Sequence, residues 1–291
     1  MVEKKNQKDL HYPEKRLRLS ASGVGAWRMC PQYWSWNYEA NLVQKTSSRP
    51  LQVGSLTHVL IHKYYMNELN LEDFQDLTAL VQKIYPDNDK NMSIDVAVET
   101  GRLVLGYLTQ YQKDPLTIIS SEMQLSVIRK EPITGYEYEV YGIVDAVCRT
   151  PDNRLWRLEH KTTAKMDSIY LGGLRQGLQG GIYHYLLNEL MPEPIVGTIY
   201  NLLVKTKIPQ YSRAPVLMQD RIAQRALSTF DGVVREILRH DIYQDAGACY
   251  SWYECPYLPL CNRDTPETRE AFYRPKEVQK PADAGSTLQP K

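Results

Sequence analysis

Apolar side chains recur at helical spacing over most of the first 112 residues. Ser20 or Ser22 can cap the first of these segments, which carries Trp27 and continues to Trp36. The last segment places its apolar residues mostly along one stripe, which is typical of a helix packed on a core. We therefore expect four helices in this part of the chain, at about residues 20–36, 52–69, 71–85 and 94–112.

Beyond residue 115 the pattern changes to the alternation of strands, with Pro132 and Gly135 marking a first turn and Pro151 a second. Three strands joined by short turns predict an antiparallel meander. A long helix, a fourth strand, a proline-containing loop and another long helix follow. The expected bounds are about 116–128, 137–149, 154–162 and 195–205 for the strands, 168–190 and 219–240 for the helices, and 208–215 for the loop. The sequence thus predicts an α/β protein whose sheet is flanked by helices.

The composition agrees with a globular protein. The 291 residues carry 35 Lys and Arg against 34 Asp and Glu, so the formal net charge is +1, and 43% of the residues are hydrophobic. This balance excludes a uniformly basic coat for nucleic acid but allows a local basic groove. We expect a flexible arm at residues 1–18, a single domain at 19–261 and a disordered polar tail at 262–291.

The sequence gives no sign of a membrane partner. Residues 1–18 contain no apolar secretion segment, and no window approaches 18 uninterrupted apolar residues. We therefore expect a cytoplasmic protein, in a bacterium or in the host cytoplasm if a phage encodes it, whose thiols stay reduced.

Three residues at the end of the meander suggest chemistry on a phosphodiester. Glu159 and Lys161 lie two apart on one strand and so leave the same face, and Asp145 lies on the preceding strand. Two converging carboxylates suit a hard cation such as Mg²⁺, and a neighbouring lysine can orient a metal-bound water and stabilise negative charge. An ordinary cross-strand ion pair on an exposed face would explain Glu159 and Lys161 equally well.

The cysteines indicate a second metal site. Five cysteines cannot all pair in one chain, and grouped thiols in a reducing compartment indicate a metal before a disulfide. Cys148 lies in a hydrophobic strand, where a buried free thiol is common. The other four suit either Zn²⁺ or a [4Fe–4S] cluster, and their spacing does not choose between the two. They are Cys30, Cys249, Cys255 and Cys261.

Taken together and in order, several short motifs resemble the PD-(D/E)XK nuclease superfamily, and within it the RecB-like branch that carries an iron–sulfur cluster and includes nucleases of CRISPR adaptation. Each motif alone is weak, and the resemblance lies in the ordered set over about residues 20–261. The matching segments are Ser20–Tyr38 with its Cys30-Pro31, Gly54 to His58 for G-x-x-x-H, Gly142 to Asp145 for G-x-x-D, Glu159-His160-Lys161 for E-x-K, and Gln179 to Tyr183 for Q-x-x-x-Y.

The resemblance implies a restriction-endonuclease-like fold with a central mixed sheet and a staple between the two ends of the chain. It implies that His58, Asp145, Glu159 and the backbone carbonyl of His160 bind Mg²⁺ or Mn²⁺, and that Lys161 is the catalytic lysine. His62, one turn beyond His58, is a lesser candidate ligand. It further implies a [4Fe–4S] cluster on the four cysteines, with Zn²⁺ as the lesser alternative. Supporting or DNA-binding roles fall to Gln179, Tyr183 and Glu122.

These observations together predict a metal-dependent DNA nuclease. We expect an exonuclease on single-stranded DNA or duplex ends, in recombination, repair or phage DNA processing, with a recombination protein as a possible partner. The alternative is a non-catalytic DNA-binding or assembly module that retains the nuclease fold. The complete set of Asp145, Glu159 and Lys161 favours the enzyme, because a binding module does not need it.

Overall fold

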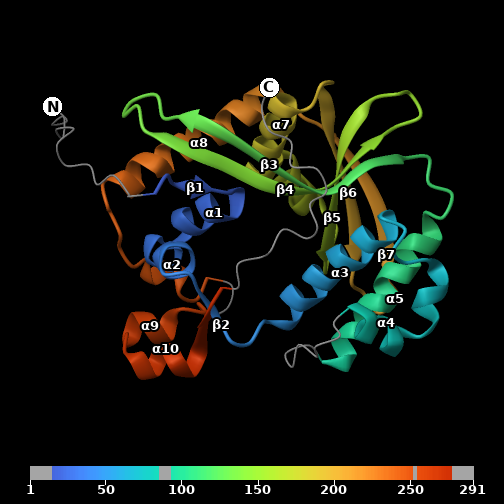
Figure 1. Ribbon diagram of the computed structural model, residues 1–291, viewed down its shortest axis with the longest axis horizontal. Coiled ribbons are helices and arrows are strands. Elements are labelled where there is room, and N and C mark those ends of the chain that lie inside the picture. The colour runs from blue at the N-terminus through green and yellow to red at the C-terminus, as the bar shows by residue number, and fades with distance from the viewer. Residues whose placement is uncertain (1–14, 85–92, 252–253, 277–291) are drawn as a thin grey trace.

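A six-stranded mixed sheet lies at the centre of the computed structural model, which describes residues 15–84, 93–251 and 254–276 (Figure 1). The strands follow the order β1-β4-β5-β6-β7, and β3 pairs with the other edge of β4. Their bounds are β1 Arg18–Leu19, β3 Thr117–Lys130, β4 Glu137–Arg149, β5 Leu155–Thr163, β6 Ile195–Val204 and β7 Gln210–Leu217.

The predicted meander is confirmed: β3 and β4 pair antiparallel, as do β4 and β5. The two turns hold because Gly135 adopts a positive φ of 74° and Asn153 one of 64°, a conformation that glycine and asparagine tolerate. After β5 the chain crosses over through two helices, so that β6 pairs parallel to β5, and β7 then returns antiparallel to β6.

Helices cover both faces of the sheet. On one face, α1 (Ala21–Met29), α7 (Leu178–Leu190) and α8 (Asp220–Leu238) bury the main apolar core against the meander, and α6 (Ser168–Gln176) packs over β6 and β7. On the other face, α3 (Arg49–Tyr65), α4 (Leu77–Ile84) and α5 (Ile94–Gln110) share a second core with Leu203 of β6. Figure 1 shows these two groups on opposite sides of the strands.

Three predicted helices are interrupted. The helix expected at 71–85 begins as a 3₁₀ helix, Leu71–Gln75, which the extended backbone of Asp76 (ψ 91°) separates from α4. The helix expected at 20–36 ends at Met29 because Cys30 is extended (φ −164°) before Pro31, and a new helix, α2 (Pro31–Trp34), begins there and continues into a π-helical turn, Ser35–Glu39. The helix expected at 168–190 breaks at Gly177, whose ψ of 146° is extended.

Two other segments are more ordered than predicted. The loop expected at 208–215 is largely β7, an edge strand in which Pro215 lacks only an N–H. The tail expected to be disordered from 262 contains α10 (Pro266–Phe272), capped by Thr265, and β8 (Tyr273–Pro275). Residues 1–14 of the predicted arm and 277–291 of the predicted tail lie outside the described residues.

The early and late parts of the chain form a small unit of their own. Strand β8 pairs with β2 (Leu42–Gln44), and the Tyr257 hydroxyl donates a 2.7 Å hydrogen bond to the Leu42 carbonyl. Tyr257 and Tyr273 stack with ring centroids 5.6 Å apart. A small core of aromatic residues with Leu260 of α9 (Leu258–Asn262) thus holds the two ends of the domain together.

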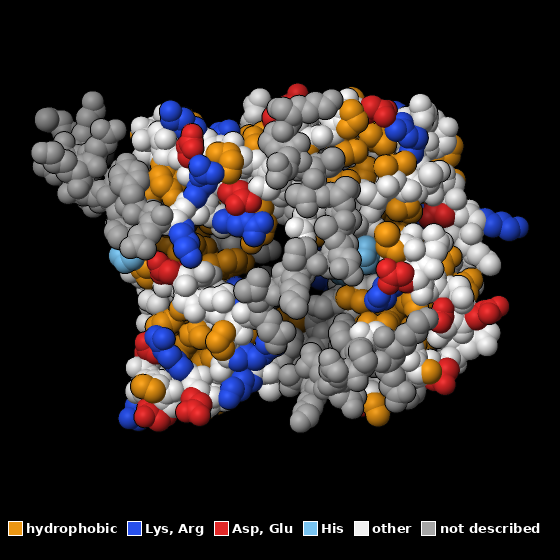
Figure 2. Space-filling model, viewed as in Figure 1, with side chains coloured by type: hydrophobic (Ala, Val, Ile, Leu, Met, Phe, Trp, Pro, Cys, Tyr) orange, Lys and Arg blue, Asp and Glu red, His pale blue; other side chains and the backbone are white. Residues whose placement is uncertain are grey.

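The surface is of mixed charge. Figure 2 shows Lys and Arg side chains interspersed with Asp and Glu on the face in view, as the net charge of +1 implies. Within the described residues, every helix is too short or too polar to cross a membrane.

Candidate active site

The candidate active site lies where β4 and β5 separate. Their backbone ladder is paired only as far as Ala146 and Leu158. Beyond this pair, a side chain replaces the backbone hydrogen bonds between the two strands. Asp145 Oδ2 accepts a 2.6 Å hydrogen bond from the backbone N–H of His160. We call this point, where β4 and β5 separate after Ala146 and Leu158, the fork. The hydrogen bond there holds Asp145 against the strand that carries Glu159 and Lys161.

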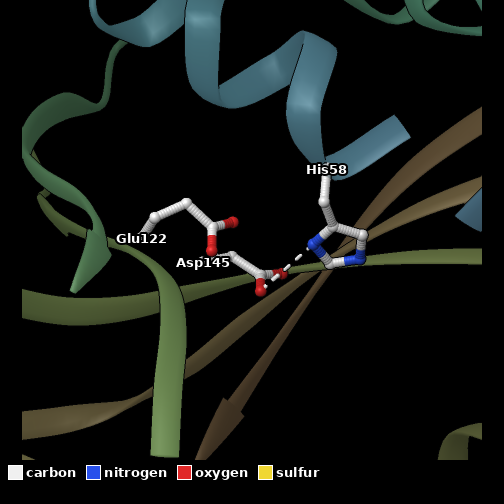
Figure 3. A group of neighbouring side chains, drawn as sticks. All are labelled: His58, Glu122 and Asp145. Atoms are coloured by element: carbon white, nitrogen blue, oxygen red, sulfur yellow. Dashed lines mark ion pairs between the residues drawn. The ribbon is translucent and has the colours of Figure 1, made fainter. Parts of the chain in front are cut away.

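Three side chains converge at this fork. His58 of α3, Glu122 of β3 and Asp145 of β4 each offer a ligand atom, and these atoms all lie within 4.8 Å of one another. His58 Nδ1 is 3.2 Å from Asp145 Oδ1, and Figure 3 shows the three side chains pointing toward a common centre. Two carboxylates and an imidazole form a donor set that suits Mg²⁺ or Mn²⁺, with the imidazole tolerated better by Mn²⁺.

Glu122 reaches this centre through a strained backbone. Its φ is +51°, in the left-handed region that costs a non-glycine residue about 1–2 kcal/mol. It lies opposite Asp145, between the pairs Ser121 with Ala146 and Met123 with Val144. Ser121 holds the distortion, because its Oγ donates to the Asp145 carbonyl at 3.1 Å and lies 2.8 Å from His62 Nδ1. His62 is thus engaged by Ser121 and is not among the three converging ligands.

Glu159 and Lys161 form a buried pair beside the three ligands. Glu159 is only 1% exposed, and its Oε1 accepts a 2.6 Å hydrogen bond from Lys161 Nζ. Lys161 Nζ also donates to Gln179 Oε1 at 2.9 Å. In the described part of the chain, Glu159 Oε2 accepts no hydrogen bond, and it forms an ion pair with the Arg157 guanidinium at 3.5 Å. The buried Glu159 carboxylate is thus paired with two cationic side chains, Lys161 through Oε1 and Arg157 through Oε2.

The predicted ligand set and the observed group overlap in part. His58 and Asp145 meet as expected, whereas the Glu159 carboxylate is turned to Lys161, and its role as a ligand stays a prediction, as does that of the His160 carbonyl. Glu122, given only a supporting role from the sequence, is the third member of the observed group. A signal for it exists, since Glu122 is the only charged residue between Thr117 and Ile128.

Burial and the crowding of carboxylates shift the pKa values of these groups. Burial, followed by the charge of Asp145, raises the pKa of Glu122 to about 7. Burial alone would lower the pKa of His58, but Asp145 and the other carboxylates raise it overall. For Glu159 the opposing effect of burial is overcome by Arg157 and Lys161, which lower its pKa. The site thus concentrates negative charge that a cation would relieve.

The glycine and tyrosine motifs meet behind this site. A Cβ on Gly142 would lie 2.2 Å from the Tyr183 ring, so only glycine leaves room for this side chain. Tyr183 is 8% exposed, and its ring stacks under the Arg157 guanidinium at 4.9 Å. Gln179 and Tyr183, predicted to share a helix face, thus brace Lys161 and Arg157 from α7.

The four predicted cluster cysteines lie in one neighbourhood of the small unit. The Asp245 N–H donates to Cys30 Sγ at 3.4 Å, and Cys255 N–H donates to the Cys249 carbonyl at 2.8 Å. Burial first, and then the nearby Cys261, Cys249 and Cys30 thiols, raise the pKa of Cys255. Among the described residues, however, no three sulfurs lie within 4.8 Å of one another. A zinc tetrahedron with Zn–S bonds of about 2.3 Å would need sulfurs about 3.8 Å apart.

Comparison with known proteins identifies the superfamily to which the chain belongs. The mixed sheet flanked by helices makes this an α/β protein, and the group of His58, Glu122 and Asp145 makes it one with a candidate metal centre. A family model of the PD-(D/E)XK nuclease superfamily matches residues 18–262, so the chain belongs to this superfamily, as the sequence motifs predicted. The iron–sulfur branch within it stays a prediction.

One solved structure supports the fold, and a second is reported for comparison only. One from Eubacterium rectale, described as a "Putative exonuclease", has a TM-score of 0.51 at 13% identity and covers 85% of this chain and 88% of its own. A second, SSO0001, has a TM-score of 0.35 at 14% identity and covers 79% of this chain and 81% of its own. No curated protein matches the sequence.

Proposed function

We propose that this protein is a Mg²⁺- or Mn²⁺-dependent DNA nuclease that acts as an exonuclease on single-stranded DNA or duplex ends. The observation that carries the proposal is the position of Lys161, whose ammonium group is held between Glu159 and Gln179 next to the carboxylates of the fork. The description of the structural neighbour from Eubacterium rectale as an exonuclease is consistent with this activity.

Each residue of the site has a task in this reaction. His58, Asp145 and Glu122 would hold the cation, with Glu159 Oε2 as a further ligand. A divalent cation held there would supply a water of lowered pKa and would neutralise charge on the phosphate. Glu159 and Gln179 hold two of the three N–H donors of the Lys161 ammonium group, and the third would donate to a phosphate oxygen and stabilise its negative charge. In-line attack then leaves a 5′-phosphate.

The test compares the wild type with Lys161→Ala on end-labelled single-stranded DNA with Mn²⁺. We expect the variant to cleave about 10²–10³-fold more slowly, which is the usual cost of removing one electrostatic donor. The matched control is Lys165→Ala, an exposed lysine that pairs with Asp167 outside the fork. A wild type that cleaves neither linear nor circular DNA with Mg²⁺ or Mn²⁺ contradicts the proposal. Cleavage of circular DNA indicates an endonuclease instead.

We also propose a [4Fe–4S] cluster on Cys30, Cys249, Cys255 and Cys261. The shared neighbourhood of these thiols supports a common ligand, and the resemblance of the sequence motifs to the iron–sulfur branch favours a cluster over a zinc ion. Iron and sulfide analysis of protein purified without oxygen tests it, with Cys148→Ser as a control that keeps all four ligands. A colourless protein that contains zinc contradicts the cluster.

A further inference from the structure

A chain of buried polar groups lies behind the strand that carries Lys161. His160 of β5, Asn201 of β6 and Arg213 of β7 are cross-strand neighbours in one row, and Asp114 follows α5. His160 and Asn201 are 2% and 0% exposed. Arg213 joins Asp114 through two hydrogen bonds, one of 2.6 Å, so the row leads from a paired charge near the surface to the centre of the E-H-K segment.

The direction of every hydrogen bond in this row is determined. Arg213 Nε can only donate, so the amide atom 2.8 Å from it is the oxygen of Asn201. The Asn201 Nδ2 then faces the Tyr107 hydroxyl at 2.7 Å and His160 Nδ1 at 3.2 Å, and it can only donate. His160 Nδ1 is therefore an acceptor, and the ring proton of the neutral imidazole is on Nε2.

The His160 ring is held from this side alone. Its Nε2 has no hydrogen-bond partner within the described ranges, and the rings of His58, Tyr65 and Tyr107 pack around it at 5.8–6.1 Å between centroids. The Tyr107 hydroxyl accepts from Asn201 and also from Arg213 at 3.3 Å. Among the residues that the structure describes, Asn201 is thus the one that fixes the orientation of the His160 ring by a hydrogen bond.

Stability does not explain why such a row is buried. Taking a charged pair and an amide out of water is costly, and well-packed apolar residues at such positions are often as stable or more so. The neighbouring positions on this face are apolar, with Leu158, Ile199 and Leu203 buried in the two adjoining cores. The polar row ends on the His160 side chain, and the backbone N–H of the same residue donates to Asp145. The row therefore connects to the candidate active site through His160.

We propose that Arg213 and Asn201 are positioning residues for hydrolysis, which act through His160 on the backbone between Glu159 and Lys161. The row locks the His160 ring, and the locked ring keeps the backbone N–H of His160 on Asp145 and holds Glu159 and Lys161, on either side of it, in register with the carboxylates of the site. The inference rests on the proposed nuclease function for its kinetic consequence only.

The test is Asn201→Asp, which keeps the shape of the side chain and the acceptor for Arg213 but replaces the donor to His160 with an acceptor. We expect kcat on single-stranded DNA to fall about 10- to 100-fold, as for other groups that orient a metal site, with KM for DNA changed less than about threefold. In metal-free protein without DNA, we expect faster amide hydrogen exchange in the peptide 155–163. Arg213→Lys, which keeps the charge but loses Nε, should shift both quantities in the same direction.

The chain provides a matched control in a second Asn–His pair. Asn188 Nδ2 lies 3.1 Å from His184 Nε2, and its Oδ1 accepts from the Ile195 N–H at 2.8 Å, near the end of α7 and away from the fork. Asn188→Asp makes the same chemical change there. We expect a lower melting temperature with kcat and exchange in 155–163 as in the wild type.

Wild-type kcat and wild-type exchange in 155–163 for both Asn201→Asp and Arg213→Lys would overturn the inference. An equal loss of kcat in Asn188→Asp would also overturn it, since the effect would then be a general loss of stability. If the wild type does not cleave DNA, the nuclease proposal fails, while the difference in hydrogen exchange between Asn201→Asp and Asn188→Asp still decides whether the row positions β5.

Discussion

The fork and the small unit that contains the four predicted cluster cysteines are two candidate metal sites. They differ in how closely their candidate ligand atoms lie together. At the fork, the protein's own hydrogen bonds bring His58, Glu122 and Asp145 within 4.8 Å of one another. In the small unit, strand pairing and stacked tyrosines hold the segments together, but no three described sulfurs come as close. The ligand atoms of the fork are thus already grouped, whereas the described sulfurs are held in one region without such a group.

The largest expected effect is on the melting temperature, when the metal of each candidate site is removed in turn. Cys255→Ser should lose the bound iron and lower the melting temperature by about 10 °C, because a structural metal site contributes its binding energy to folding. Stripping divalent cations with EDTA should change the melting temperature by less than about 2 °C. Calorimetry measures both, with Cys148→Ser as the control for losing a thiol. Equal shifts for the two treatments would remove the contrast between the sites.

A smaller effect is expected from Gly142→Ala, which tests the packing that supports the fork. The new Cβ would lie 2.2 Å from the Tyr183 ring, so the ring must move, and we expect a loss of about 1–3 kcal/mol in unfolding free energy with a lower kcat. Gly25→Ala in α1, where nothing lies within 4 Å of the new Cβ, should instead be neutral or stabilise by up to about 1 kcal/mol. Urea unfolding of both variants measures the difference.

Two substitutions of Glu122 should separate the cost of its backbone strain from its contribution to metal binding. Glu122→Gly relieves the positive φ and is expected to raise the unfolding free energy by up to about 1 kcal/mol, while Glu122→Gln keeps the strain. Both variants should need more Mn²⁺ for half-maximal cleavage, because both lose a carboxylate. A Glu122→Gly protein that is less stable than Glu122→Gln would contradict the claim that strain is stored at this position.

The smallest expected effect concerns pH and lies outside both sites. Burial lowers the pKa of His184, so the unfolded chain binds more protons than the folded one as the pH falls below about 6.5. Stability is therefore lost as the pH is lowered from 7 toward 5.5. His184→Gln should reduce the slope of unfolding free energy against pH over this window, and an unchanged slope would refute the assignment to His184.

Much of the fold could be predicted from the sequence because alternation and turn residues are local signals. The meander, α5 and α8 agree closely with their predicted bounds. The interruptions at Cys30 and Gly177 were missed, although proline and glycine mark both, because the apolar stripe continues across them. β7 was missed since Pro215 is tolerated only because β7 is an edge strand, which is a property of the sheet.

For the site, the motifs predicted Asp145, Glu159, Lys161 and His58, but they understated Glu122. Its carboxylate reaches the centre only through a left-handed backbone that Ser121 and His62 hold from other elements. Such a conformation is not a local preference of glutamate and has no signal in a single sequence. The buried row of Asn201 and Arg213 is likewise hidden, because each residue comes from a different strand.

The pairing of β2 with β8 joins a segment that is synthesised well before its partner. Residues 42–44 leave the ribosome early, and their partners at 273–275 are among the last described residues to be made. Until then, β2 has an open edge, and Tyr257 lacks the ring on which it stacks. Contacts so distant along the chain form slowly, and an unpaired edge can associate with other chains. A chain shortened to residue 262, where the family match ends, would stay in this vulnerable state.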